Sequence, residues 1–420
     1  MFIYTVKPGD SLYAISQKYQ IPIEDIRLAN GLSGQNLAIG QALFMNTSTY
    51  VVQPGDTFYA IAKMSYVPLE TLLQANPTLN PNRLDAGTRV NLPKFSPYSA
   101  SSFCYMYITG TSQDLALIRD FAPYTTYYSF FEYHFTSDGS LNALDDLRGI
   151  EASWNNRCAP LATITNLTAS GFSSQVTNQV LSNRTSRENL INNIYHVTSS
   201  RGYKGVNIDF ENLLTEDREN FSLFLQELRG RLKRDNLLLT VAVPPKSSEE
   251  FSWLRGFDYR AIGAACDLVF IMAYDWHHRS SEPGPVAPLN EIQKTIAYAT
   301  GQMENSKILI GVPLYGYDWV LPYNPANLAS TVSNQQAVDL ARNAGATIEY
   351  SEASQSPYFH YTDQNGQQHV VWFEDSRSMA EKMLLIRNSG LDGLGAWQIN
   401  LGFPQGPWLL TTFFTVKKVV

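Results

Sequence analysis

Short apolar runs of strand length alternate with longer amphipathic segments from residue 103 onward. The segments between the runs carry apolar residues at the spacing of a helix face. After the fourth run, this stripe consists of Phe221, Phe224, Leu225, Leu228 and Leu232. Strands alternating with helices predict an α/β fold, a (β/α)8 TIM barrel. Its expected strands are residues 103–108, 126–131, 161–165, 205–211, 237–243, 268–274, 308–313 and 393–398.

The chain between the seventh and eighth expected strands, about residues 320–390, is too long for a single barrel connection. It contains short strand-like segments at 348–350, 358–361 and 369–372, and an Asn-Gly pair within residues 363–366. An Asn-Gly pair between such segments is typical of a β-hairpin. We therefore expect a small α+β insertion that forms one wall of a cleft.

The N-terminal part of the chain contains an internal repeat. Residues 4–15 (YTVKPGDSLYAI) recur as residues 50–61 (YVVQPGDTFYAI). Each unit has the pattern strand, helix, helix, strand, and this predicts two small βααβ domains at residues 1–47 and 48–95. A Ser- and Pro-containing linker at about residues 95–102 leads into the barrel domain, which is assigned to residues 96–420.

Short polar and proline positions mark the expected helix starts of both repeats. Asp10-Ser11 and Asp56-Thr57 are expected to cap the first helix of each unit. In the same way, Pro22 and Pro68 are expected in the first turn of the second helix.

Both repeats resemble the LysM domain from end to end. Members of that family bind N-acetylglucosamine chains of peptidoglycan or chitin through the loop after the first strand and the loop before the last. The resemblance implies glycan binding here by at least one repeat. The implied positions are Gly9, Asp10, Ser11, Leu12 and Asn30 in the first repeat, and Gly55, Asp56, Thr57, Phe58 and Asn76 in the second.

The fourth expected strand carries polar side chains on one face only. In GVNIDFEN (205–212), Asn207, Asp209 and Glu211 alternate with apolar residues. An inward face at the mouth of a barrel accommodates this pattern, and Glu211 would lie at the carboxyl end of the strand, where barrel enzymes keep their catalytic groups. Two carboxylates this close and partly out of water resist both being charged. We expect them to titrate as a coupled pair that holds a proton near neutral pH.

This strand and the surrounding barrel resemble glycoside hydrolase family 18. The family signature Asp-x-x-Asp-x-Asp-x-Glu falls here on Lys204, Asn207, Asp209 and Glu211. Further similarity lies at 272–275 (MAYD), at 311–316 (GVPLYG) and at Trp397.

The resemblance to family 18 implies a set of roles. In that family the nucleophile is the 2-acetamido carbonyl of the substrate. Glu211 would then be the acid and base, Asp209 would bind the acetamido N–H, and Tyr274 would hold the acetamido oxygen. The residues implied in substrate binding are Asn207, Asp275, Met272, Tyr315 and Trp397, with Trp397 as the floor of the subsite.

Three departures from the family pattern qualify the resemblance. Asn207 replaces an aspartate; its amide can hydrogen-bond Asp209 but cannot share a proton with it. Lys204 replaces another aspartate and is interpreted as a surface change. The third strand, 163–166 (TITN), lacks the Ser-x-Gly-Gly of many chitinases, which weakens a chitinase assignment.

The composition of the chain argues against nucleic-acid binding, a metal or cofactor site and a membrane span. The net charge of -7 provides no basic surface for nucleic acid. The three cysteines form no CxxC pair, and His277-His278 are adjacent without a third ligand nearby, so no metal and no cofactor are expected. No apolar run is long enough to span a membrane, and the N-terminus lacks a signal-peptide pattern. We expect a monomer that is made in the cytoplasm.

Two LysM-like units ahead of a family 18 barrel resemble spore-associated peptidoglycan hydrolases of endospore-forming bacteria. This implies an N-acetylglucosaminidase that cuts the β-1,4 bond after N-acetylglucosamine in spore cortex with retention of configuration, and a location at the spore coat or cortex. Two alternatives stay open. One is a non-catalytic glycan-binding or spore-coat protein on the same scaffold, and the other is a chitinase-like enzyme or endo-β-N-acetylglucosaminidase.

Overall fold

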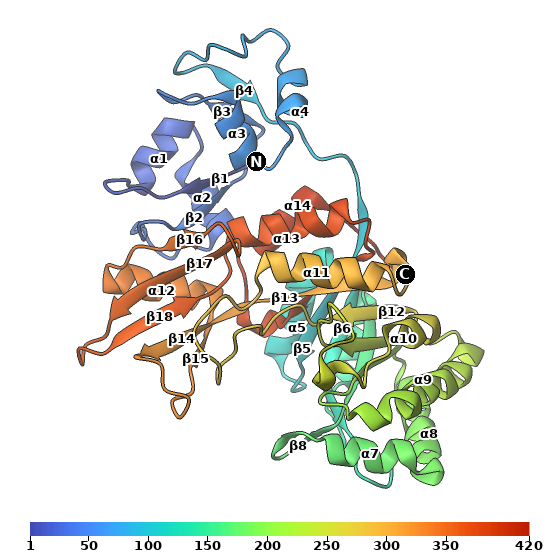
Figure 1. Cartoon of the computed structure of the whole chain (residues 1–420). Coiled ribbons are helices and arrows are strands. Elements are labelled where there is room, and N and C mark those ends of the chain that lie inside the picture. The colour runs from blue at the N-terminus through green and yellow to red at the C-terminus, as the bar shows by residue number, and fades with distance from the viewer. Residues whose placement is uncertain (420) are drawn as a thin grey trace.

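The computed structural model describes residues 1–419, and its centre is a closed barrel of parallel strands (Figure 1). Each strand pairs in parallel with the next, and the last strand pairs with the first, which closes the barrel. The predicted (β/α)8 TIM barrel is therefore confirmed. Its strands, in barrel order, are β5 (Ser99–Tyr107), β6 (Tyr127–His134), β7 (Ala159–Thr165), β10 (Gly205–Asp209), β11 (Leu238–Val243), β12 (Leu268–Ile271), β13 (Ile308–Pro313) and β19 (Gly393–Trp397).

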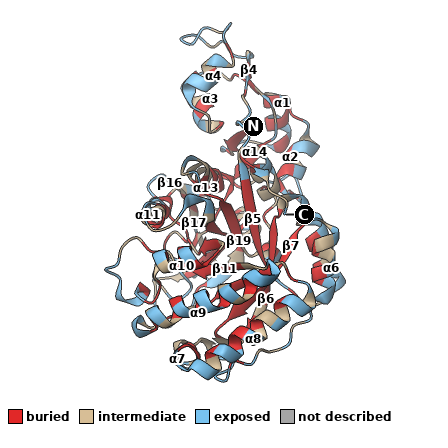
Figure 2. Ribbon diagram, turned by 90° about the vertical axis from the view of Figure 1, so that its right-hand side faces the viewer, coloured by how far each residue is buried: buried red, intermediate tan, exposed pale blue. Residues whose placement is uncertain are grey.

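Helices surround the barrel with their apolar sides turned inward. Figure 2 shows the buried strands enclosed by helices whose outer faces are exposed. The predicted stripe after β10 is buried along α9 (Arg218–Leu232). The other surrounding helices are α5 (Ser112–Phe121), α6 (Leu147–Asn155), α7 (Ser174–Ser182), α8 (Arg184–Arg201), α10 (Tyr259–Ala265), α11 (Leu289–Thr300), α13 (Ser376–Asn388) and α14 (Gly406–Phe413).

The two faces of β10 separate as the alternation predicts. Phe210 packs under the helices, with its ring 5.5 Å from that of Phe224 on α9. Asn207 and Asp209 are buried within the barrel. The strand ends at Asp209, earlier than predicted, so Glu211 lies in the segment that follows the strand.

An antiparallel sheet is inserted between β13 and β19. Its order is β15-β14-β18-β17-β16, and the predicted hairpin joins β17 to β18. The insertion begins directly after β13, earlier than the predicted residue 320, because β14 continues from that strand. Its elements are β14 (Tyr315–Leu321), β15 (Ser330–Ser333), α12 (Asn334–Ala344), β16 (Glu349–Ser351), β17 (Ser356–Thr362) and β18 (Gln368–Trp372).

Two small βααβ domains precede the barrel, as predicted. In each domain the first and last strands pair antiparallel beside two helices. We call them domain 1 and domain 2. Domain 1 consists of β1 (Phe2–Thr5), α1 (Leu12–Tyr19), α2 (Ile23–Asn30) and β2 (Ala42–Met45), and domain 2 of β3 (Thr49–Val51), α3 (Phe58–Met64), α4 (Leu69–Gln74) and β4 (Arg89–Asn91).

The helix caps of domains 1 and 2 are only partly as predicted. Ser11 and Thr57 cap α1 and α3, each accepting a backbone N–H at 3.1 Å. The capping role expected of Asp10 and Asp56 is wrong, because each carboxylate instead accepts a tyrosine hydroxyl and a backbone N–H that close the preceding turn. The two prolines expected in a first turn precede α2 and α4 at the cap position.

Domain 1 packs directly on the insertion. The carbonyl of Ile39 accepts the N–H of Ile348 at 2.9 Å, and Ala38 belongs to an apolar cluster with Ile348, Phe359 and Phe373. Arg377 on α13 donates to the carbonyl of Gly40 at 3.2 Å. Domain 1 and the barrel domain therefore share a packed surface and are not joined only by a linker.

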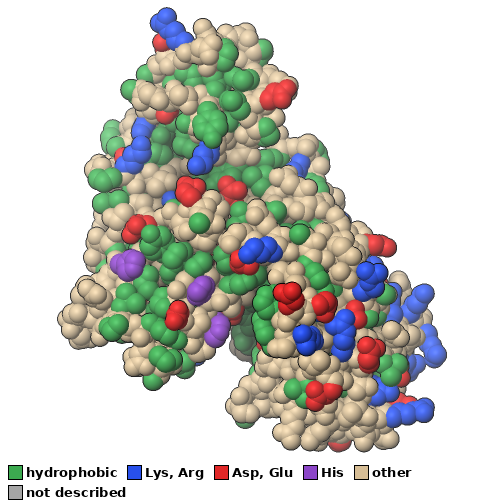
Figure 3. Space-filling model, viewed as in Figure 1, with side chains coloured by type: hydrophobic (Ala, Val, Ile, Leu, Met, Phe, Trp, Pro, Cys, Tyr) green, Lys and Arg blue, Asp and Glu red, His purple; other side chains and the backbone are tan. Residues whose placement is uncertain are grey.

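The surface of residues 1–419 is mixed in charge. Figure 3 shows acidic and basic side chains interspersed over the helical side of the barrel. Within the same residues, no helix is long and apolar enough to cross a membrane.

Two equivalent glycines allow the docking of domain 1 to be tested. Gly40 and Gly87 both adopt a positive φ, of +80° and +85°. A methyl group on Gly40 would lie 1.8 Å from the carbonyl oxygen of Ile348, whereas one on Gly87 would meet nothing within 4 Å. Both alanine variants should lose about 1 kcal/mol from backbone strain. Only Gly40→Ala should also detach domain 1, seen as a larger radius of gyration in solution scattering and faster proteolysis between the domains. Equal behaviour of the two variants would contradict this docking.

Candidate active site

The catalytic candidates gather at the carboxyl ends of the barrel strands. A cavity of about 540 Å³ is lined there by Glu211, Met272, Tyr274 and Asp275. These residues follow β10 and β12, which are separated in the sheet only by β11. The fold therefore brings together side chains that lie far apart in the sequence.

Asp209 is a buried carboxylate at the end of β10. Only 3% of the residue is exposed, and its Oδ1 atom has no hydrogen-bond partner among the described residues. Burial raises the pKa of Asp209 to about 7, and the charge of Glu132 adds to the effect. An oxygen without a partner is expensive to bury, so it is available for a donor that a substrate supplies.

Glu211 lies two residues further on and is partly buried in the wall of the cavity. The pKa of Glu211 is raised to about 8. Burial is the largest cause, and the negative charges of Asp209 and Asp275 add to it. A carboxyl group with this pKa carries a proton at neutral pH, as a general acid must. The two carboxyl groups thus titrate as a coupled pair in which burial and mutual repulsion raise both pKa values and keep a proton near neutral pH.

Asn166, after β7, holds the backbone of Glu211 in place. Its Nδ2 atom donates to the carbonyl of Glu211 at 2.8 Å, and its Oδ1 atom accepts the N–H of Glu211 at 2.9 Å. This paired contact replaces the ladder bonds that Glu211 loses because β10 has already ended. The sequence identifies Asn166 only as part of a departure from the chitinase pattern, so its positioning role was missed.

Tyr274 and Asp275 form the opposite side of the site. Burial raises the pKa of Tyr274 well above its ordinary range, so its hydroxyl remains a donor. Asp275 adopts a positive φ of 62°, and its Oδ1 atom accepts the hydroxyls of Tyr315 at 2.7 Å and Tyr317 at 3.1 Å. The buried hydroxyl of Tyr315 therefore orients Asp275, and direct substrate binding by Tyr315 stays a prediction.

Asn207 lies beneath the reacting groups and supports other side chains. Its Nδ2 atom donates to the hydroxyl of Tyr105 at 2.7 Å, and its Oδ1 atom accepts the hydroxyl of Thr240 at 2.9 Å. Both amide atoms are thus occupied and the residue is fully buried. No hydrogen bond joins Asn207 to Asp209 in this arrangement, and substrate binding by Asn207 stays a prediction.

Trp397 ends β19 across the barrel from Asp209. Its ring packs edge-on against Tyr105 at 5.3 Å and Phe131 at 5.0 Å, and the residue is partly exposed. The role of Trp397 as the floor of a sugar subsite stays a prediction, as does substrate contact by Met272.

Glu132 is a further acidic residue of the site that the sequence did not single out. It lies within an irregularity in the pairing of β6 with β7, and its Oε2 atom accepts the hydroxyl of Thr165 at 2.9 Å. Thr165 is the β7 partner of Asp209 in the strand register. The predicted strand ended at residue 131, one position too early to place this carboxylate at the barrel mouth.

The LysM-type positions divide into surface and buried groups. Gly9, Ser11, Gly55 and Thr57 are exposed, and Asp10 and Asp56 are partly so. Four other positions are buried: Leu12, Asn30, Phe58 and Asn76. The two asparagines bind backbone groups of the last helix and last strand of their own domains. Glycan binding at all of these positions stays a prediction.

Within residues 1–419, no group of three or more His, Cys, Asp or Glu side chains could hold a metal ion. The Nδ1 atoms of His277 and His278 contact the carbonyl of Glu282 and the hydroxyl of Ser280, respectively.

Two families account for nearly the whole chain. Residues 106–402 match the family Glycosyl hydrolases family 18, and residues 4–45 and 50–93 match the LysM domain. The chain therefore belongs to glycosyl hydrolase family 18 and carries two LysM domains, which are domains 1 and 2. It is a glycoside hydrolase.

Several relatives match over full length. A Bacillus subtilis (strain 168) protein with the provisional name sporulation-specific glycosylase YdhD is 50% identical over 420 residues, covering 100% of both chains. The cortical fragment-lytic enzyme of Bacillus anthracis is 36% identical over 425 residues, covering 99% of each. The crystal structure of the Bacillus cereus spore cortex-lytic enzyme SleL superposes with a TM-score of 0.89 at 34% identity and covers 99% of both chains.

The raised pKa of Glu211 predicts a loss of activity at alkaline pH. Glu211 must be protonated to act as an acid, so kcat/KM should fall as pH rises through about 8. Asp209→Asn removes a negative charge that raises the pKa of Glu211, so kcat/KM should begin to fall at a lower pH, and its maximum should also be lower. Asp275→Asn should shift the pH of this fall by a smaller amount. The pH dependence of kcat/KM tests this, and an unchanged pH of the fall in Asp209→Asn would contradict the charge coupling.

The contact between Asn166 and Glu211 predicts a positioning effect. Asn166→Ala frees the backbone that carries the acid, so kcat should fall on the order of 10²-fold while KM changes little. Asn193 on α8 is a matched control, because its Nδ2 atom holds the carbonyl of Gly139 at 2.8 Å away from the site. Steady-state measurements of kcat and KM on both alanine variants test this prediction. If Asn193→Ala loses as much kcat as Asn166→Ala, the effect is general destabilisation and not positioning of Glu211.

Proposed function

We propose that this glycoside hydrolase cuts spore-cortex peptidoglycan at the β-1,4 bond that follows N-acetylglucosamine, with retention of configuration. The observation that carries the proposal is the buried Asp209–Glu211 pair, in which one oxygen lacks a partner and the other carboxyl group holds a proton. Full-length similarity to cortical fragment-lytic enzymes supports the choice of polymer.

The proposed mechanism uses the 2-acetamido group of the substrate as the nucleophile. Its carbonyl oxygen attacks the anomeric carbon while Glu211 gives its proton to the leaving oxygen. Asp209 accepts the acetamido N–H and stabilises the positive charge of the cyclic oxazolinium ion, and Tyr274 donates to the acetamido oxygen. Glu211, now ionised, then takes a proton from the water that opens the ring. Two inversions leave the product in the starting configuration.

This chemistry restricts the sugar that can be attacked. The ring that supplies the nucleophile must carry a free N-acetyl group. Muramic-δ-lactam, whose nitrogen is tied into a second ring, cannot supply one. The bond that is cut should therefore follow N-acetylglucosamine.

The two LysM domains would hold the enzyme on the same polymer. Binding by one domain raises the local concentration of glycan at the others without any new contact in the cleft. We propose that this retention associates the protein with the spore, at its coat or cortex.

A chitin-like polymer is the main competing substrate, and product analysis separates the two. Purified cortex fragments should yield new reducing ends at N-acetylglucosamine, and NMR should detect the β-anomer first. Glu211→Gln should lower turnover at least about 10³-fold while glycan binding persists, because the amide keeps the shape but has no acidic proton. Products that appear first as the α-anomer would contradict the mechanism, and hydrolysis of chitin but not of cortex would contradict the substrate.

A further inference from the structure

The loop between β11 and α10 places two exposed aromatic side chains beside the acid. Phe251 is 44% exposed and Trp253 64% exposed, and their ring centroids are 6.5 Å apart. Both line the same cavity as Glu211 and Tyr274. Large aromatic side chains gain by leaving water, so such exposure within a cleft calls for an occupant.

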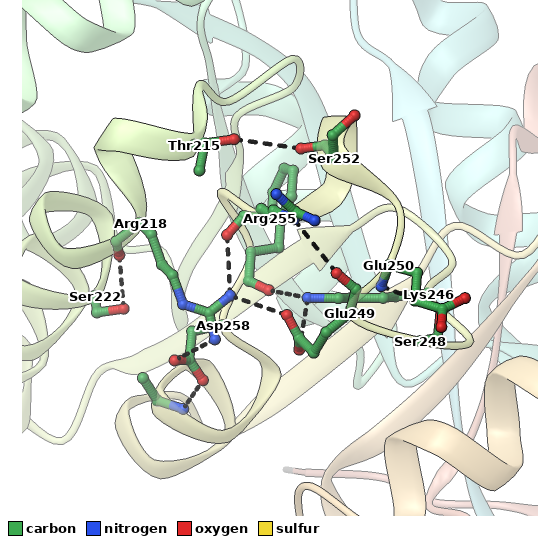
Figure 4. A network of polar contacts seen from close by, with 12 residues as sticks. Thr215, Arg218, Ser222, Lys246, Ser248, Glu249, Glu250, Ser252, Arg255 and Asp258 are labelled. Carbon is green, nitrogen blue, oxygen red and sulfur yellow. Dashed lines mark hydrogen bonds and ion pairs between the residues drawn. The ribbon is translucent and has the colours of Figure 1, made fainter.

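The aromatic pair stands on a loop that is firmly closed at its base. Lys246, which is fully buried, donates to the carbonyl of Phe257 at 3.0 Å and pairs with Glu249 at 2.8 Å. The start and the end of the loop are thereby tied together. Figure 4 shows this lysine and Glu249 at the centre of the contacts.

A second cation joins the loop to the neighbouring helices. Arg218, at the start of α9, pairs with Glu249 at 3.3 Å and with Asp258 at 2.7 Å, and it donates to the carbonyl of Arg255 at 2.9 Å (Figure 4). Asp258 in turn caps α10. Phe251 and Trp253 are therefore held in place by polar contacts below them while their rings remain open to solvent.

The place of this loop in the barrel assigns it to one side of the scissile bond. β11 lies next to β10, which carries the acid, whereas β12 and β13 separate it from β19 and Trp397. The acid protonates the oxygen that leaves, so a sugar placed over Trp397 and Tyr274 would extend its leaving partner past Glu211. The β11 loop lies in that direction.

We propose that Phe251 and Trp253 form the subsite for the sugar ring on the leaving side of the cleaved bond. Pyranose rings present a face of C–H groups that stacks on aromatic rings. The inference rests on the proposed function for the direction of the substrate, and it makes these two residues determinants of substrate length and of transfer to acceptor sugars.

A comparison of two substrates tests the subsite. An N-acetylglucosamine pentamer has sugars on the leaving side, whereas the oxazoline of N,N'-diacetylchitobiose has none and reports only the ring-opening step. Trp253→Ala should lower kcat/KM on the pentamer by about tenfold, mainly through KM, and change oxazoline hydrolysis by less than about twofold. Trp253→Phe should recover most of the loss. Trp408→Ala, which removes an exposed tryptophan on α14, is the matched control and should change neither reaction.

Equal losses on the two substrates, or no loss on the pentamer, would overturn the subsite. If the unmodified chain hydrolyses neither of these chitin-type substrates, binding decides the inference, and the proposed function is judged separately by its activity on cortex fragments. Pentamer affinity is then measured on Glu211→Gln with and without Trp253→Ala. A roughly tenfold weaker affinity in the double variant supports the aromatic subsite, and an unchanged affinity rejects it.

Discussion

The desolvation of Asp209 and Glu211 is the constraint on which the chemistry of this protein depends. Two carboxyl groups placed two residues apart at a buried strand end cannot both be charged at neutral pH without a large electrostatic cost. This cost is avoided when one of the two groups keeps its proton. A proton on Glu211 and an unsatisfied oxygen on Asp209 are the result, and both are useful only when a sugar arrives.

The surrounding structure serves mainly to hold this pair and to face it. Asn166 fixes the backbone of Glu211, and Asn207 occupies the space beneath Asp209 while engaging Tyr105 and Thr240. Across the site, two tyrosine hydroxyls orient Asp275. The polar contacts of Lys246 and Arg218 have a similar supporting role farther from the reacting groups, because they hold the loop between β11 and α10 in place and contribute no reacting group.

The sequence was most informative where a single periodicity controls the structure. Alternation along residues 205–211 placed Asp209 inside the barrel and Phe210 outside, and the repeat revealed both LysM domains. Prediction from the sequence failed where one residue type can take either of two structural roles. Asp10 can cap a helix or close a turn. Local spacing cannot distinguish the two roles, because the hydroxyl of Tyr4 determines which of them Asp10 takes. Asn166 and Glu132 act through contacts between different strands, which no local pattern records.

The central claim is that the acetamido oxygen of the substrate, oriented by Asp209 and Tyr274, attacks the anomeric carbon. Substrates whose acetyl group carries one, two or three fluorine atoms test it directly, because each fluorine weakens that oxygen as a nucleophile and changes the size of the group little. The account predicts a steep, graded fall in kcat/KM across the series. A flat series, with the trifluoroacetyl substrate cleaved as fast as the natural one, would contradict it.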